Sequence, residues 1–147
     1  VNGHGGNTGA LHIATQQVAG EIKAKVFVVE WWDLAPDVIA KLFAPPFYHA
    51  CETETSMVLA LDQRVDIGKA KPSVPRRGSR FIAHDFMAIG PKVYEPLLDM
   101  RTITETGAVG DPTKATREKG QELLDAVLDR FAGFIKELKT SRGASSS

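Results

Sequence analysis

A stripe of apolar residues at helical spacing is the clearest pattern in the sequence, and it lies near the C-terminus. It consists of Leu123, Val127, Phe131, Ile135 and Leu138. Charged residues of alternating sign occupy the other face of this predicted helix. We expect Asp111 or Thr113 to cap the helix, with Pro112 near its first turn.

Similar spacing predicts helices over residues 8–23 and 52–61, and a short helix over residues 33–42. Residues 25–31 (KVFVVEW) are almost wholly apolar and rich in β-branched and aromatic side chains, as is typical of a buried strand. The aromatic residues of segment 81–89 indicate a second strand. Loops are predicted over residues 43–48, 71–80 and 100–111, the first because two consecutive prolines exclude regular structure.

The order of strands and helices predicts an α/β fold with a layered, mainly parallel sheet flanked by helices. No interior linker is long enough to divide two domains, so we expect residues 1–140 to belong to one domain. Residues 141–147 are small and polar and should form a disordered tail. Because Val1 leads directly into a glycine-rich loop, we expect the N-terminal part of this domain to be missing.

Charge and composition narrow the range of partners. The 18 basic and 18 acidic residues balance, which argues against nucleic acid or an anionic membrane as the main partner. No apolar run approaches the roughly 20 residues of a membrane-spanning helix, and no signal peptide is visible. Cys51 is the one cysteine, which fits a reducing compartment. We therefore expect a cytoplasmic protein.

A glycine-rich motif, NGHGGN at residues 2–7, stands at the predicted junction of a strand and a helix. Ligands bind at this edge of open α/β sheets, and the neutral imidazole of His4 would be a good ligand for zinc or manganese. A glycine-rich turn with a solvated histidine is the plainer interpretation. A phosphate-binding loop is a third interpretation, although the motif lacks the Lys-Ser/Thr ending of a P-loop.

A second cluster, HACETETS at residues 49–56, places His49, Glu52 and Glu54 at the start of a predicted helix. The two glutamates point in different directions on a helix, so we expect them to have different roles. The preceding proline-rich loop can form the wall of a pocket. The helix dipole also favours carboxylates in a first turn, so both glutamates could equally serve only to stabilise the helix.

Trp31 and Trp32 end the predicted strand of residues 25–31. Aromatic rings at the tip of a strand can stack on a flat ligand. One tryptophan in the core and one at its rim is the plainer interpretation.

Taken together, these blocks resemble the creatininase (creatinine amidohydrolase) family. NGHGGN, WWDLA, HACETETS and GAVGDPTKATREKG match the family in order and spacing from Val1 to about Leu138. The resemblance implies an α/β enzyme with a two-metal site, usually zinc or manganese. Such an enzyme hydrolyses carbon–nitrogen bonds in small, often cyclic, amides, and we expect this one to form a homo-oligomer.

The resemblance also implies roles for single residues. His4 matches the metal-ligating histidine of the family's N-G-H motif, and His49 matches the histidine that shuttles protons near the scissile bond. Glu54 and Thr55 match the family's E-T-S, as support for the catalytic groups. In this view His49 and Glu54 are the catalytic residues.

The expected substrate-binding residues are aromatic. Trp31 or Trp32 falls where the family's substrate-stacking tryptophan is expected. Tyr48 stands just before the catalytic histidine, in a stretch where creatininase proper has a second tryptophan. This difference puts creatinine itself in doubt as the substrate.

The expected metal ligands also depart from the family's pattern. Creatininase proper has a ligating glutamate where this chain has Gly6, and an apolar residue where this chain has Glu52. We therefore expect Glu52 to replace the lost ligand and to bind the same metal as His4. The family's other ligands would lie upstream of the motif, so the 147-residue chain alone should be inactive and bind metal weakly.

The mechanism implied by the resemblance is metal-assisted hydrolysis of a small-molecule amide. Two metals would lower the pKa of a bridging water and polarise the carbonyl, and His49 would give a proton to the leaving nitrogen. An alternative is a non-catalytic or nucleotide-binding α/β module that uses the glycine-rich loop and needs no metal. A further alternative is an inactive half whose surface meets its own N-terminal part.

Overall fold

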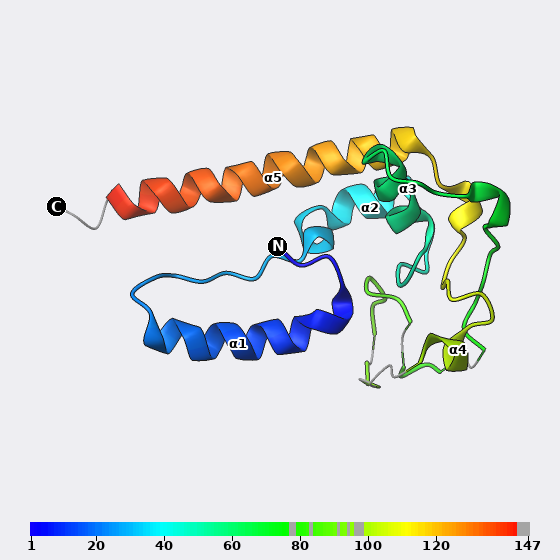
Figure 1. Cartoon of the computed structure of the whole chain (residues 1–147), viewed down its shortest axis with the longest axis horizontal. Helices are drawn as coiled ribbons and strands as arrows, with labels where there is room; N and C mark the ends of the chain where they lie inside the picture. Colours follow the sequence, from blue (N-terminus) through cyan, green and yellow to red (C-terminus); the bar gives the residue numbers. More distant parts are fainter. Residues whose placement is uncertain (77–78, 83, 91, 94, 96–98, 144–147) are drawn as a thin grey trace. The chain divides into compact units, whose positions relative to one another are not determined.

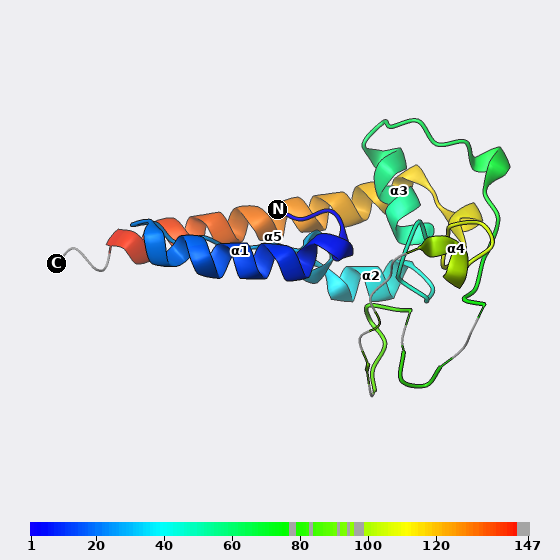
Figure 2. The same cartoon turned by 60° about the horizontal axis from the view of Figure 1, so that its bottom comes forward.

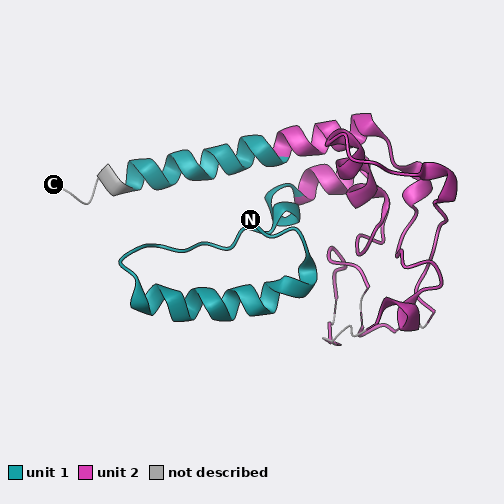
Figure 3. Cartoon of the chain, viewed as in Figure 1, with its two compact units in different colours: residues 1–35, 127–147 teal, residues 36–126 magenta. Residues whose placement is uncertain are grey.

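The computed structural model describes residues 1–76, 79–82, 84–90, 92–93, 95 and 99–143 (Figures 1 and 2). The chain divides into two compact units (Figure 3). The first is formed by residues 1–35 and 127–147, and the second by residues 36–126. No helix within the described residues has the length and apolar character needed to cross a membrane.

The first unit contains α1 (Thr8–Glu21) and the later part of α5 (Arg117–Gly143), with two 3-10 turns, η1 (Gly5–Asn7) and η2 (Trp31–Leu34). After α1 the chain runs back in an extended conformation, so that Glu30 forms an isolated parallel bridge with Asn2. The α1 helix follows the predicted spacing, but it has no buried residue in this structure.

The predicted parallel sheet is wrong for the part of the chain that the structure describes, which contains no strand. Three isolated bridges occur there: Asn2 with Glu30, His49 with Val109, and Ser73 with Gly110. The apolar composition of residues 25–31 predicted burial, but a strand also needs a neighbouring strand to form a ladder of hydrogen bonds. Residues 25–27 are exposed in this structure, and the bridge at Glu30 is not extended along them.

Segment 81–89 contains bends and turns in place of the predicted strand, among its described residues. The side chain of Ser79 accepts hydrogen bonds from the backbone N–H groups of Phe81 and Ile82. The carboxylate of Asp85 accepts one from the backbone N–H of Met87, at 2.9 Å. Such local bonds between side chain and backbone compete with the ladder of a sheet, which explains the difference.

Among its described residues, the second unit contains the short helices α2 (Pro36–Leu42), α3 (Glu52–Ala60) and α4 (Met100–Ile103). It also contains the 3-10 turns η3 (Ile67–Lys69) and η4 (Pro112–Lys114) and the first part of α5. The helix predicted over residues 52–61 is confirmed as α3. The buried apolar residues of this unit are Ile39, Phe43, Cys51, Ala60, Ala108, Val109 and Leu123.

The long C-terminal helix is confirmed as α5, but its predicted cap is wrong. The Asp111 side chain accepts a hydrogen bond from the backbone N–H of Thr113, and so it caps the η4 turn. At the start of α5 the hydroxyl of Thr116 accepts one from the backbone N–H of Lys119, at 3.2 Å. The helix continues to Gly143, and residues 144–147 of the predicted tail lie outside the described residues.

The first turns of α5 lie directly against α3, because Gly120 has no side chain. A Cβ atom added at Gly120 would stand 1.9 Å from the backbone oxygen of Ser56 and 3.1 Å from the Cβ of Ala60. The Ser56 hydroxyl is fully buried and accepts a hydrogen bond from the backbone N–H of Thr116, at 3.1 Å. The two helices therefore meet backbone to backbone at this point.

We predict that Gly120→Ala lowers the free energy of unfolding by about 1–3 kcal/mol, because the new methyl group must push α5 away from α3. Denaturant titration measures this change. Gly133→Ala on the same helix is the matched control, since a Cβ atom there meets nothing within 4 Å. It should stabilise the protein by up to about 1 kcal/mol through helix propensity. Equal effects of the two variants would contradict the close contact.

Candidate functional site

A cavity of about 310 Å³ opens beside the start of α3. It is lined by His49, Ala50, Glu54, Thr55, Val58 and Val65. The two residues predicted to be catalytic, His49 and Glu54, thus face the same space. Apolar side chains from α3 and the following loop form much of the rest of its wall.

The turn that carries His49 is held at two points. The backbone oxygen of His49 accepts a hydrogen bond from the backbone N–H of Val109, at 2.8 Å. The next residue, Ala50, has a φ of 46°, in the left-handed region that costs a residue with a Cβ atom about 1–2 kcal/mol. The carboxylate of Glu54 accepts a hydrogen bond from the backbone N–H of Ala50 and so stabilises this turn.

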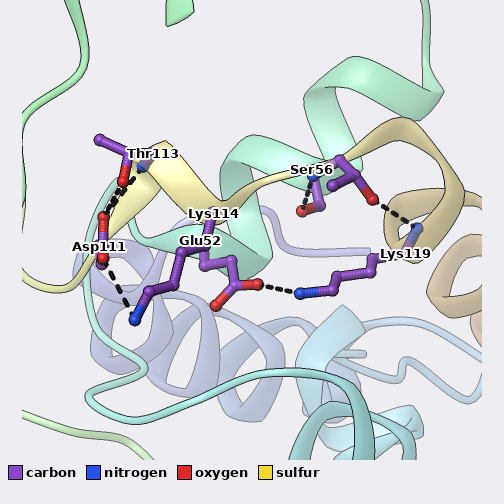
Figure 4. A network of polar contacts seen from close by, with 7 residues as sticks. Glu52, Ser56, Asp111, Thr113, Lys114 and Lys119 are labelled. Carbon is purple, nitrogen blue, oxygen red and sulfur yellow. Dashed lines mark hydrogen bonds and ion pairs between the residues drawn. The ribbon is translucent and has the colours of Figure 1, made fainter.

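The two glutamates of the second cluster point in different directions, as the sequence predicted. Glu54 lines the cavity, whereas the Glu52 side chain is only 5% exposed and forms an ion pair with Lys119 of α5 (Figure 4). Lys119 was not identified from the sequence. Thr116 and Lys119 are three residues apart, so the capping hydroxyl of Thr116 and the ammonium group of Lys119 lie in the same turn at the start of α5. This spacing is the signal in the sequence that points to Lys119.

The N-G-H motif is organised by Asn2, another residue that the sequence analysis did not single out. The Asn2 amide nitrogen donates to the backbone oxygen of His4 at 2.9 Å and to Oε2 of Glu30 at 2.7 Å. Its amide oxygen accepts from the backbone N–H of His4. A Cβ atom at Gly6 would stand 2.7 Å from Nε2 of His4, so this glycine leaves room for the imidazole.

Glu30 and Asp33 make the region after the extended segment acidic. Oε1 of Glu30 is buried and has no hydrogen-bond partner among the described residues. Burial raises the pKa of the Asp33 carboxyl above its ordinary value, and the negative charge of Glu30 raises it further. The Asp33 carboxyl is therefore harder to ionise than that of an ordinary aspartate.

The aromatic residues predicted to bind substrate already contact other rings. Trp31 and Trp32 are half-buried and pack edge to face, with ring centroids 5.7 Å apart. Tyr48 stacks on Phe86 with centroids 5.2 Å apart and meets His84 edge to face at 5.3 Å. Substrate stacking by these three residues stays a prediction.

A complete metal site is not present among the described residues, because no three His, Cys, Asp or Glu side chains gather there in a way that could hold an ion. Of the two predicted ligands, His4 lies in the first compact unit and Glu52 in the second. Their sharing of one metal therefore stays a prediction. The carboxylate of Glu52 has a lysine ammonium group as its partner in this structure.

Comparisons with known proteins point to one family. Residues 1–135 match the family model Creatininase, described as creatinine amidohydrolase. The fold is similar to that in the crystal structure of a putative creatinine amidohydrolase from Bacteroides fragilis NCTC 9343, with a TM-score of 0.63 and 23% identity. The match covers 84% of this chain and 47% of that chain, so this chain spans about half the length of the protein it resembles. No curated protein matches.

We predict that Glu54→Ala lowers the free energy of unfolding by about 1 kcal/mol, because the left-handed turn at Ala50 loses its acceptor. Glu54→Gln keeps an acceptor oxygen at the same position and should lose less than half as much. Chemical denaturation of both variants measures the difference. Equal losses would show that the bond to Ala50 contributes nothing to stability.

A pH dependence follows from Asp33. Since its folded-state pKa is raised, ionisation of Asp33 opposes folding, and this penalty develops as the pH rises from about the ordinary value of 3.8 through the raised value. Asp33→Asn should therefore be more stable than the wild type at pH 7, with the difference shrinking below pH 3.8.

Asp99→Asn is the control, because its expected effect on stability is opposite to that of Asp33→Asn. Hydrogen bonds from Arg101 lower the pKa of Asp99, so this change should destabilise the protein at pH 7 and have less effect in acid. Thermal unfolding between pH 3 and pH 7 measures both variants. An Asp33→Asn variant that is less stable than the wild type at pH 7 would contradict a raised pKa of Asp33 in the folded protein.

Proposed function

Because the chain belongs to the creatininase family, as its motifs predicted, we propose that it hydrolyses a carbon–nitrogen bond in a small amide. The observation that supports this most is the cavity that His49 and Glu54 share. Its volume of about 310 Å³ is at the lower end of the range for small-molecule sites, which suits a small and possibly cyclic amide.

His49 is proposed as the general acid. The nitrogen of an amide leaves readily only when it receives a proton, and imidazole is the side chain that most often exchanges protons near neutral pH. The hydrogen bond from Val109 to the His49 backbone and the bond from Ala50 to Glu54 fix the turn that carries the ring. This preorganisation would hold the imidazole beside the scissile bond.

The substrate proposed for this cavity is largely apolar, with an amide group at one end. Val58 and Val65 offer apolar walls, and the carboxylate of Glu54 offers an acceptor for N–H groups. Tyr48 precedes His49 in the chain and is proposed to cover one side of the substrate.

Enzymes of the creatininase family generally use a divalent metal ion. For this chain we propose zinc or manganese, with His4 as the donor that it contributes, since the carboxylate of Glu52 is paired with the ammonium group of Lys119. The described residues do not make a complete site by themselves. The chemistry proposed above is accordingly limited to the proton transfer by His49 and the positioning role of Glu54.

The proposal is tested by turnover and metal content measured together, with creatinine and other small cyclic amides as substrates. We predict that His49→Gln lowers kcat by about 100-fold or more, as expected for loss of a general acid. Its metal content should not change, whereas His4→Gln should lose metal. His12→Gln, an exposed position on α1, should match the wild type in both measurements.

Each other outcome has a distinct meaning. Loss of metal in His49→Gln would make this histidine a ligand, and unchanged turnover would make it structural. A wild-type protein that hydrolyses no amide and holds no metal, but binds a nucleotide in calorimetry, would replace the hydrolase proposal with the binding-module alternative.

A further inference from the structure

The ion pair between Glu52 and Lys119 differs from others in the same unit by its burial. The Glu52 side chain is 5% exposed, and Nζ of Lys119 lies 2.5 Å from its Oε1 (Figure 4). By contrast, Lys41 and Glu122, which link α2 to α5, are 71% and 51% exposed. A surface pair of that kind contributes little, whereas a buried carboxylate that loses its partner is strongly disfavoured.

The backbone of Lys119 is held by contacts other than the ion pair with Glu52. Its backbone N–H is capped by Thr116, and the backbone N–H of Thr116 donates to the buried hydroxyl of Ser56 on α3. The neighbouring Gly120 allows the backbones of the two helices to touch. The ring of Phe43 lies 5.9 Å from the Lys119 ammonium, close enough for a cation–π contact. These contacts fix the backbone of Lys119, and its ammonium group meets both the carboxylate of Glu52 and the ring of Phe43.

The α3 helix connects this ion pair to the cavity. Glu52 and Ser56 are four residues apart and both contact α5, so they share one face of α3. Glu54 and Val58 are also four residues apart, and they line the cavity. Both sets of residues belong to the same short helix, so a shift of the residues that face α5 would also move those that face the cavity. It would move the turn of His49 as well, because this turn lies just before α3.

We propose that Lys119 is a positioning residue for the candidate active site. Its ammonium group anchors the carboxylate of Glu52, the first residue of α3, and through α3 it fixes the turn of His49 and Ala50 at the cavity. The inference deepens the proposed function and rests on it. Lys119 does not line the cavity, so its effect on the reaction is indirect.

The test compares four variants of the protein that carries this chain. Lys119→Met removes the charge and Lys119→Arg retains it. Lys41→Met removes the charge of the exposed pair that also reaches α5. The double variant Glu52→Gln, Lys119→Met leaves no unpaired buried carboxylate, and it is used if Lys119→Met alone does not fold.

Two readouts are measured: steady-state kinetics, and the ¹H–¹³C signals of the four histidine imidazoles, with that of His49 assigned through His49→Gln. Lys119→Met should lower kcat by about 10-fold or more, since small displacements of a catalytic group are costly. KM should change by less than about threefold, because substrate binding is not the step affected. The His49 signal should shift, and Lys119→Arg should restore most of kcat and of the signal position.

Lys41→Met should leave both readouts at the wild-type position. A Lys119→Met protein that melts earlier but keeps the kcat and the His49 signal of the wild type would overturn the inference, since Lys119 would then be merely structural. So would an unmoved His49 signal in the double variant. If the wild type shows no amide hydrolysis, the proposed function fails, and the His49 signal still decides whether Lys119 positions this turn.

Discussion

The backbone contact between α3 and α5 is the constraint on which the second unit depends. Gly120 must lack a side chain for Ser56 to lie where it does, and this contact sets the distance across which Lys119 meets Glu52. Because α3 begins at Glu52, directly after the turn of His49, the packing of the two helices constrains the position of the histidine that we propose as the general acid. The cavity is thus a consequence of helix packing as well as of loop conformation.

The sequence predicted those elements that are fixed by local patterns. The spacing of Leu123 and Val127 identified α5, and the spacing of apolar residues in segment 52–61 identified α3. The parallel sheet was wrong because a strand is defined by its neighbour, which the composition of residues 25–31 does not reveal. The cap of α5 was predicted wrongly because the Asp111 side chain accepts its hydrogen bond within the η4 turn, which comes first in the chain. The local sequence does not show whether Asp111 caps this turn or the long helix.

The proximity of two candidate site residues was predictable where a motif places them close together in the chain. His49 and Glu54 are five residues apart, and the structure brings both to one cavity. Lys119 is 67 residues from Glu52, and Asn2 is 28 residues from Glu30, so their contacts depend on the tertiary structure. The spacing of Thr116 and Lys119 indicates the start of a helix, but it does not reveal that the lysine pairs with Glu52.

Gly6 has a consequence for how such a site can change over evolutionary time. Any side chain at this position would begin 2.7 Å from Nε2 of His4, within the volume of the imidazole. A glutamate could therefore be accommodated there only if the His4 ring adopted another rotamer. To exchange glycine for a ligating carboxylate at position 6, the protein must therefore change the residue at position 6 and the orientation of the His4 ring together. A metal ligand transferred from a relative to position 6 should therefore be introduced together with a change that makes room beside His4.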